Sequence, residues 1–218
     1  MKTCIRILIA LGLLALQFGC SKDTPTQSKP PEEEQDNFPK AIDFTLSDAD
    51  GKSYTAATTI PDITRRIDSV WWEPVEDPDD STLAKLIVRA TDPAGFGNYI
   101  RYFTKTNEGP FLPGFNSVFD DQVIDGTTYT FPVDRGFDKN LDPSDYEPFF
   151  NRGDTVTVKV ADIDKVTYDF WRTLEFSYQS VGNPFSNPVK VLGNISNGAL
   201  GYFGGYAAQY HRLVIPQQ

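Results

Sequence analysis

Apolar and polar residues alternate over many short stretches of the chain, a pattern typical of strands with one buried face. In residues 83–90, Leu86, Val88 and Ala90 share a face, and in residues 155–161 Val156 and Val158 do the same. This period of two predicts strands, because successive side chains of a strand point to opposite sides. The same pattern predicts strands at 42–46, 53–58, 66–72, 98–106, 128–133 and 206–215.

The turn residues and the alternation also predict how the strands connect and which side chains share a face. Residues 48–51 read Asp-Ala-Asp-Gly, a strong turn signal that predicts a hairpin between the first two strands. Ile100 and Tyr102 lie opposite Arg101, so residues 98–106 have two distinct faces. In residues 66–72, strict alternation puts Ile67 with Trp71 on one side and Trp72 on the other.

One segment has the period of a helix instead. Its apolar positions recur three and four residues apart, at Val166, Phe170, Trp171, Leu174 and Tyr178. The charged or amide positions that fall opposite them are Lys165, Asp169, Arg172, Glu175 and Gln179. Asp164 is expected to cap the first turn, and Gly182 to follow the last. We expect Phe170, Trp171 and Leu174 to pack against a sheet.

These elements predict a mainly β fold without the alternation of strands and helices that parallel sheets require. Short strands at this spacing favour an antiparallel β-sandwich, immunoglobulin-like or jelly-roll-like, with one long amphipathic helix near the C-terminal end. Residues 41–218 form the single domain expected, and its length suffices for a sizeable core.

The first twenty residues have the features of an export signal for a lipoprotein. Lys2 and Arg6 supply positive charge, and residues 7–16 form an apolar run too short to span a bilayer. The run ends at Gly19-Cys20, so we expect residues 1–19 to be a signal peptide and Cys20 to carry lipid. The alternative is an ordinary secretory signal followed by a free cysteine.

Residues 20–40 are predicted to be a disordered tether. They are rich in Pro, Glu, Ser and Gln and have hardly any apolar side chain, so they cannot bury enough surface to order themselves. The triplet 21–23, Ser-Lys-Asp, is similar to a signal that directs bacterial lipoproteins to the outer leaflet of the outer membrane. Cys4 leaves with the signal peptide, so no cysteine remains for a disulfide.

The net charge argues against nucleic acid as a ligand. The chain carries 20 basic and 30 acidic residues, for a net charge of -10. Removal of Lys2 and Arg6 with the signal leaves 18 basic residues against 30 acidic, or -12. A surface of this sign repels phosphate backbones.

Several ordered motifs resemble one known family. They are ATDPAGFGNYIRY at 90–102, FDDQVIDGTTYTFPVDRGFD at 119–138, GDTVTVKVADID at 153–164 and TYDFWRTLEFSYQSVGNPFSNPVKVLGNISNGALGYFGGY at 167–206. They resemble an uncharacterised lipoprotein family of the Bacteroidota catalogued as domain of unknown function 4249. The resemblance implies no catalytic residues. It implies a partner, because members are often encoded beside TonB-dependent outer-membrane receptors. Members usually begin with an immunoglobulin-like segment, which we expect to be missing here.

A calcium site is one hypothesis from the residues themselves. Asp138, Asn140 and Asp142 alternate like the first ligands of a calcium-binding loop. Pro143 stands where an EF-hand requires glycine, and Phe149 where its closing glutamate belongs. The alternative is a solvated acidic loop, and no other cofactor is expected.

Aromatic residues supply the candidates for ligand binding. Trp72 lies beside Trp71 on the opposite face of a predicted strand, and Phe111 and Phe115 lie in the turn-rich segment 109–115. Exposed aromatic rings bind sugars or protein partners because they bury flat apolar area. Packing in the core is the alternative for all three.

Paired acids at Asp120 and Asp121 are the strongest hint of catalysis. A glycosidase needs two carboxyl groups that flank one bond, whereas adjacent residues of a strand point to opposite faces. We therefore expect no enzymatic activity. The leading interpretation is a lipid-anchored, surface-exposed outer-membrane protein that binds a partner or nutrient beside a TonB-dependent receptor. The alternatives are a glycan-binding module, with a glycan or peptide as ligand, and a hydrolase with an unrecognised carboxylate site.

The lipid anchor is directly testable. In cells given radiolabelled palmitate, the wild type is expected to incorporate label and enter the detergent phase, whereas Cys20→Ala is not, because it lacks the acceptor thiol. Equal labelling and partitioning of the two proteins would contradict the lipoprotein assignment.

Overall fold

The computed structural model describes residues 40–217, apart from 77–79, 143, 145 and 188. They belong to one compact unit, Phe38–Gln218. The predicted signal peptide, Cys20 and the tether as far as residue 39 lie outside the described residues. Across the part that is described, no helix is both long and apolar enough to cross a membrane.

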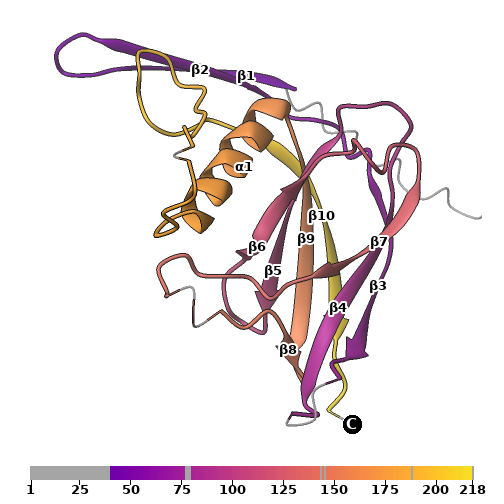
Figure 1. The fold of residues 1–218 in the computed structure, drawn as a ribbon. Coiled ribbons are helices and arrows are strands. Elements are labelled where there is room, and N and C mark those ends of the chain that lie inside the picture. The colour runs from indigo at the N-terminus through magenta and orange to yellow at the C-terminus, as the bar shows by residue number, and fades with distance from the viewer. Residues whose placement is uncertain (1–39, 77–79, 143, 145, 188, 218) are drawn as a thin grey trace, which may run out of the picture. The chain divides into compact units, whose positions relative to one another are not determined.

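The described chain forms antiparallel strands and a single helix, which confirms the predicted mainly β class (Figure 1). The elements are β1 (Ala41–Ser47), β2 (Ser53–Thr59), β3 (Arg66–Pro74), β4 (Leu83–Thr91), β5 (Tyr99–Thr106), β6 (Leu112–Phe119), β7 (Thr128–Val133), β8 (Phe150–Asn151), β9 (Thr155–Ile163), α1 (Lys165–Gln179) and β10 (Tyr206–Val214). All predicted strands are present, and β6 and β8 are additional.

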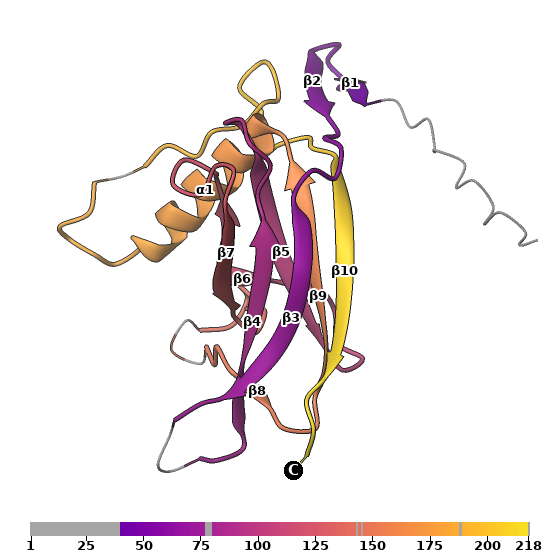
Figure 2. The same ribbon diagram turned by 90° about the vertical axis from the view of Figure 1, so that its right-hand side faces the viewer.

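Two four-stranded sheets enclose the main core. One has the order β10-β9-β5-β6, and in the other β3-β4-β7 is joined by β8, which pairs with β4. Leu86 and Val88 of β4 meet Ile100 of β5 and Val156 and Val158 of β9 in one buried cluster. The sheets therefore pack face to face, as predicted for a sandwich. Figure 2 looks onto the edge where β3 and β10 run side by side, and there Gln209 donates to the carbonyl of Arg65.

A bulge in β3 overturns its predicted faces. Ile67 pairs with Ala90 and Ser69 with Arg89, so Asp68 is an extra residue in the ladder. Ile67 therefore enters the same core as Val70 and Trp72, not the face of Trp71. Strict alternation cannot detect this, because one inserted residue reverses the face of everything before it.

The strand β6 corrects the interpretation of residues 109–115 as a loop throughout. Pro113 and Gly114 argued against a strand here, because proline and glycine both weaken a central strand. The structure places β6 at a sheet edge, where proline is tolerated. A Cβ atom at Gly114 would overlap the ring of Tyr102, so the missing side chain makes room for a core residue.

The predicted β1–β2 hairpin is confirmed but forms a separate two-stranded sheet. Its turn is closed by Asp48, whose Oδ1 accepts from the backbone N of Lys52 at 2.8 Å. The glycine-rich segment 193–205 holds the hairpin, because Ser196 Oγ accepts from Thr55 N at 2.7 Å and Asn197 Nδ2 donates to Ser53 O.

Asp164 caps the start of α1 and Gly182 follows its end, as the sequence predicts. The Oδ1 of Asp164 accepts from Thr167 N at 2.8 Å, and its Oδ2 accepts from Thr59 N at 3.0 Å, which ties the helix start to β2. Burial alone would raise the pKa of Asp164, but the hydrogen bonds from Thr167, Thr59 and Thr58 outweigh it and hold the pKa below 3.8. Gly182 follows the helix with a φ of 80°, as a C-terminal cap requires.

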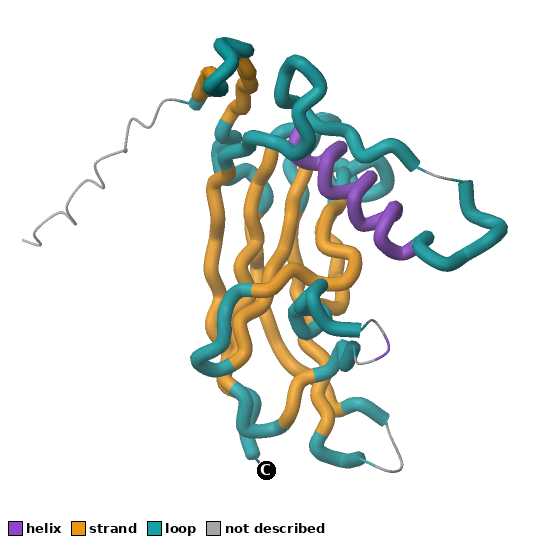
Figure 3. Tube along the Cα trace, turned by 90° about the vertical axis from the view of Figure 1, so that its left-hand side faces the viewer, coloured by secondary structure: helices purple, strands orange, loops and turns teal. Residues whose placement is uncertain are grey.

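The helix packs on the outer face of the β10-β9-β5-β6 sheet with a different stripe from the one predicted (Figure 3). Tyr168 lies on Tyr99, with ring centres 4.8 Å apart, and the buried Glu175 also faces the sheet. Phe170 instead stacks on Tyr202 of the glycine-rich segment at 4.5 Å, and Val166 is exposed.

Trp171 lies between these two contacts. It is half-buried, and the Arg101 guanidinium lies 3.4 Å from its ring centre. Glu175, which was predicted to lie on the polar side of the helix, is buried, because Arg101 of β5 supplies a cation near it.

Glu175 is the centre of a buried polar cluster between α1 and the sheet. Its Oε2 accepts from Ser117 N at 3.0 Å and its Oε1 from Ser117 Oγ. Arg101 Nη2 and Lys139 Nζ lie 4.0 and 3.7 Å from Oε1. Burial lowers the pKa of Arg101 to about 10, and the charge of Glu175 opposes part of that shift.

Loss of this carboxylate is expected to destabilise the fold. Glu175→Gln keeps the shape but leaves Arg101 and Lys139 without their anion, so the free energy of unfolding should fall by about 3 kcal/mol. Thermal and urea unfolding measure the change. Glu108→Gln is the matched control, since Glu108 lies 3.7 Å from Lys105 but is 96% exposed. A Glu175→Gln protein that melts with the wild type would contradict a structural role for the cluster.

Candidate functional site

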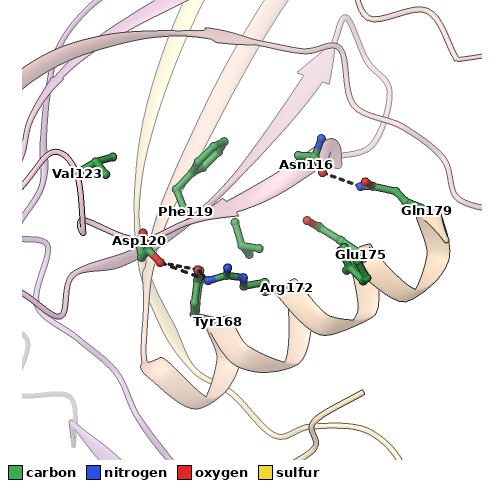
Figure 4. A pocket seen from close by; sticks show the side chains of 10 residues that line it. Asn116, Phe119, Asp120, Val123, Tyr168, Arg172, Glu175 and Gln179 are labelled. Atoms are coloured by element: carbon green, nitrogen blue, oxygen red, sulfur yellow. Dashed lines mark hydrogen bonds and ion pairs between the residues drawn. The ribbon is translucent and has the colours of Figure 1, made fainter. Parts of the chain in front are cut away.

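A groove of about 370 Å³ runs between β6 and α1 on the outside of the sandwich (Figure 4). We call it the α1/β6 groove. It is lined by Asn116, Val118, Phe119, Asp120, Val123, Tyr168, Arg172, Glu175, Phe176 and Gln179. The Glu175–Ser117 hydrogen bonds hold its two walls together from beneath.

Polar groups are fixed at both ends of the α1/β6 groove. At one end Tyr168 donates its hydroxyl to Asp120 Oδ2 at 2.8 Å, and Arg172 Nη1 donates to the same hydroxyl at 2.6 Å. Burial, and then Asp120, raise the pKa of Tyr168 to about 12. At the other end Gln179 Nε2 donates to Asn116 Oδ1 at 2.6 Å. The side chain of Arg172 is 62% exposed, so its remaining donors reach solvent.

Phe119 and Phe176 lie between these polar ends in sequence, and Val123 lies beyond Asp120 (Figure 4). Phe176 is 54% exposed, Phe119 is 38% exposed and Val123 is 92% exposed. Exposed apolar side chains gathered beside fixed donors and acceptors are typical of surfaces that bind another molecule.

The carboxylates of the α1/β6 groove do not form an acid–base pair around a shared position. Both oxygens of Glu175 accept from Ser117, and Asp120 Oδ2 accepts from Tyr168. Asp121, adjacent in sequence to Asp120, turns away and accepts from the backbone of Gly97 and Asn98. The structure therefore separates the two adjacent acids, although both follow the end of β6 and do not lie within a strand as the prediction from alternation assumed.

The three aromatic candidates lie in three different places. Trp72 packs against the core, with the Arg152 guanidinium 5.0 Å from its ring centre. Phe115 is half-buried and stacks on Tyr146 at 5.3 Å. Phe111 remains 37% exposed and contacts Tyr210 edge to face at 5.9 Å. Of the three, Phe111 presents the most accessible ring.

The predicted calcium ligands each serve a local turn. Asp138 Oδ1 accepts from Asn140 N at 3.0 Å and from its Nδ2 at 2.7 Å. Asp142 Oδ1 accepts from Ser144 N at 2.9 Å. Hydrogen bonds of this kind shape a turn without any ion.

A different acidic group could hold a cation. Carboxylate oxygens of Asp92, Asp121 and Asp125 lie within 4.8 Å of one another. Sequence reasoning missed this group because Asp92 is distant along the chain and the pairing of β4 with β7 brings it near. The available signal was an acid at the start of each of two glycine-containing turns, Asp92-Pro-Ala-Gly and Asp121-Gln-Val-Ile-Asp-Gly.

Comparisons with known proteins agree with the motifs. No curated protein and no solved structure matches the chain at a significant level. The family model described as Domain of unknown function (DUF4249) matches residues 40–212. This range includes every strand and the helix except the last residues of β10. Since the match covers most of the chain, the protein belongs to the DUF4249 family.

Proposed function

We propose that the protein is a non-enzymatic binding or accessory component held at the outer-membrane surface by lipid on Cys20. Its partner is a TonB-dependent receptor engaged in nutrient uptake, and the α1/β6 groove is the surface that receives a polypeptide segment of this receptor. The single observation that carries the proposal is the composition of the groove, with exposed Phe119 and Phe176 between two fixed polar ends.

The polar groups of the groove favour recognition of a peptide over chemistry. Arg172 projects unused donors that suit a carboxylate or a backbone carbonyl, and Asn116 and Gln179 offer an amide donor and acceptor. Phe176 supplies apolar area at the rim. Aromatic and arginine side chains together dominate the binding energy of many protein interfaces.

The proposed location at the outer membrane rests on the N-terminal sequence. The lipoprotein signal and the tether support a protein anchored outside the cytoplasm. A tether of about twenty residues lets the folded unit reach a neighbouring receptor while its lipid remains in the membrane.

The groove is tested by one charged substitution. Phe176→Lys is expected to reduce recovery of a TonB-dependent receptor at least about tenfold when the protein is purified from solubilised outer membranes. A lysine removes apolar area at the contact and is tolerated near a helix C-terminus. Quantitative mass spectrometry of the eluate measures recovery. Phe185→Lys is the matched control, because Phe185 is 95% exposed and does not line the groove. No receptor with the wild type, or equal recovery with both variants, would contradict the proposal.

A second candidate function, glycan binding, is favoured by an aromatic surface on the other part of the same sheet. Tyr206 is 48% exposed, Tyr210 is 57% exposed and Phe111 is 37% exposed. Lys159 lies beneath them and donates to the Tyr206 hydroxyl at 2.7 Å. Flat rings with polar edges stack on sugar rings.

Sugar binding is tested with neutral oligosaccharides from cellulose, xylan and starch. If this surface binds one of them, calorimetry should show at least about a tenfold loss of affinity in Tyr210→Ala, equivalent to about 1.4 kcal/mol. Val214→Ala should bind like the wild type, since Val214 is exposed on the same strand and lacks a ring. Unchanged affinity in Tyr210→Ala would remove this surface as the glycan site.

A further inference from the structure

Three carboxylates meet where the segment after β4 packs against the segment between β6 and β7. Asp92 follows β4, and Asp121 and Asp125 lie in the second segment. One carboxylate oxygen of each lies within 4.8 Å of those of the other two. Asp92 and Asp121 are each 2% exposed, and Asp125 is half-buried. Negative charges this close and this buried repel one another unless a cation lies among them.

The protein supplies only part of the positive charge that this group needs. Arg65 Nε donates to Asp92 Oδ1 at 2.7 Å, and Arg65 Nη2 donates to the same oxygen. Within the described residues, no ion pair reaches Asp121 or Asp125. Three carboxylates and one guanidinium leave two negative charges, which a divalent cation neutralises.

Asp92 also presents an oxygen without a partner. Its side chain is fully buried, Oδ1 is taken by Arg65, and Oδ2 has no hydrogen bond in the part of the chain that is described. A buried carboxylate oxygen left unpaired is costly. Oδ2 is therefore the oxygen of Asp92 that is free to bind a cation between the three carboxylates.

The other two carboxylates are each oriented through one oxygen. Asp121 Oδ2 accepts from Gly97 N at 2.8 Å and Asn98 N at 2.9 Å. Asp125 Oδ1 accepts from Gly95 N at 2.6 Å. These backbone bonds fix both carboxylates, and the hydrogen bonds seen among described residues leave Asp121 Oδ1 and Asp125 Oδ2 for a further ligand.

We propose that Asp92, Asp121 and Asp125 bind one calcium ion. Three oxygens within 4.8 Å of one another share a centre at most about 2.8 Å from each, close to calcium–oxygen distances of about 2.3 to 2.6 Å. Magnesium requires metal–oxygen distances of about 2.0 to 2.1 Å and near-ideal octahedral geometry. The three carboxylates would have to move closer together to bind magnesium than to bind calcium. Oxygen ligands alone favour a hard cation over zinc.

The ion would join two segments that are far apart in sequence. Asp120 and Val123 line the α1/β6 groove and lie one residue before and two residues after Asp121, so calcium would also stabilise one wall of that groove. The site itself requires no receptor, and its test is independent of the binding function proposed above.

The test uses the full chain, solubilised in detergent and stripped with EGTA. Calcium chloride at about 5 mM should raise the Tm of the wild type by about 5 °C or more, because an ion that binds only the folded state stabilises it by mass action. Asp125→Asn should lose this shift, since the amide still accepts from Gly95 but lacks the charge. Asp138→Asn, in the loop that the sequence suggested, is the matched control and should shift like the wild type. Calorimetry at 15 °C should show one ion per chain for the wild type and the control.

Four results would overturn the proposal. They are no calcium-dependent shift and no binding heat in the wild type, an equal shift in Asp125→Asn, loss of the shift in Asp138→Asn alone, or a magnesium shift as large as that of calcium. Circular dichroism in EGTA checks that Asp125→Asn is folded, and Asp121→Asn provides a second variant with the same expected loss.

Discussion

Burial of the central strands β5 and β9 on both faces is the constraint on which the remaining structure depends. One face of these strands, with Ile100, Val156 and Val158, closes the core against the second sheet. The other face, with Tyr99, Ala161 and Ile163, requires its own cover. The helix α1 supplies this cover, and the glycine-rich segment packs against α1 in turn. A sheet buried on both sides holds its register strongly, because a slip of one residue would exchange its two sets of side chains.

The buried charges between α1 and the sheet fix the position of β6 relative to the helix, which apolar packing alone would not do. Arg101 lies beneath Trp171 and near Glu175, and Glu175 holds the edge strand β6 through Ser117. A buried ion pair adds little net stability compared with an apolar replacement, but its directional bonds select one arrangement. The same contacts keep β6 beside the helix and thereby form the α1/β6 groove. They also satisfy the buried backbone N–H of Ser117, which the irregular pairing of β5 with β6 leaves outside the ladder.

The proposed functions use different parts of one sheet and the turns beside it. The α1/β6 groove lies at its β6 edge, the aromatic surface lies toward β10, and the acidic group follows β4 and β6. Asp120 and Asp121 connect the first and last of these, since one faces the groove and the other joins the acidic group. Function in this fold is thus expected at surfaces and turns around a rigid framework, not in its core.

The sequence by itself determined the strands other than β6 and β8, the helix with its Asp164 cap, the fold class and the family motifs. These features depend on local periodicity and on turn and cap chemistry, which neighbouring residues encode. Tertiary structure decided the bulge at Asp68, the edge strand through Pro113 and Gly114, and the burial of Glu175. It also brought Asp92 to Asp121 and Asp125 and put Trp72 in the core. Each of these depends on a partner distant along the chain, and a periodic pattern holds no information about which distant residue arrives opposite it.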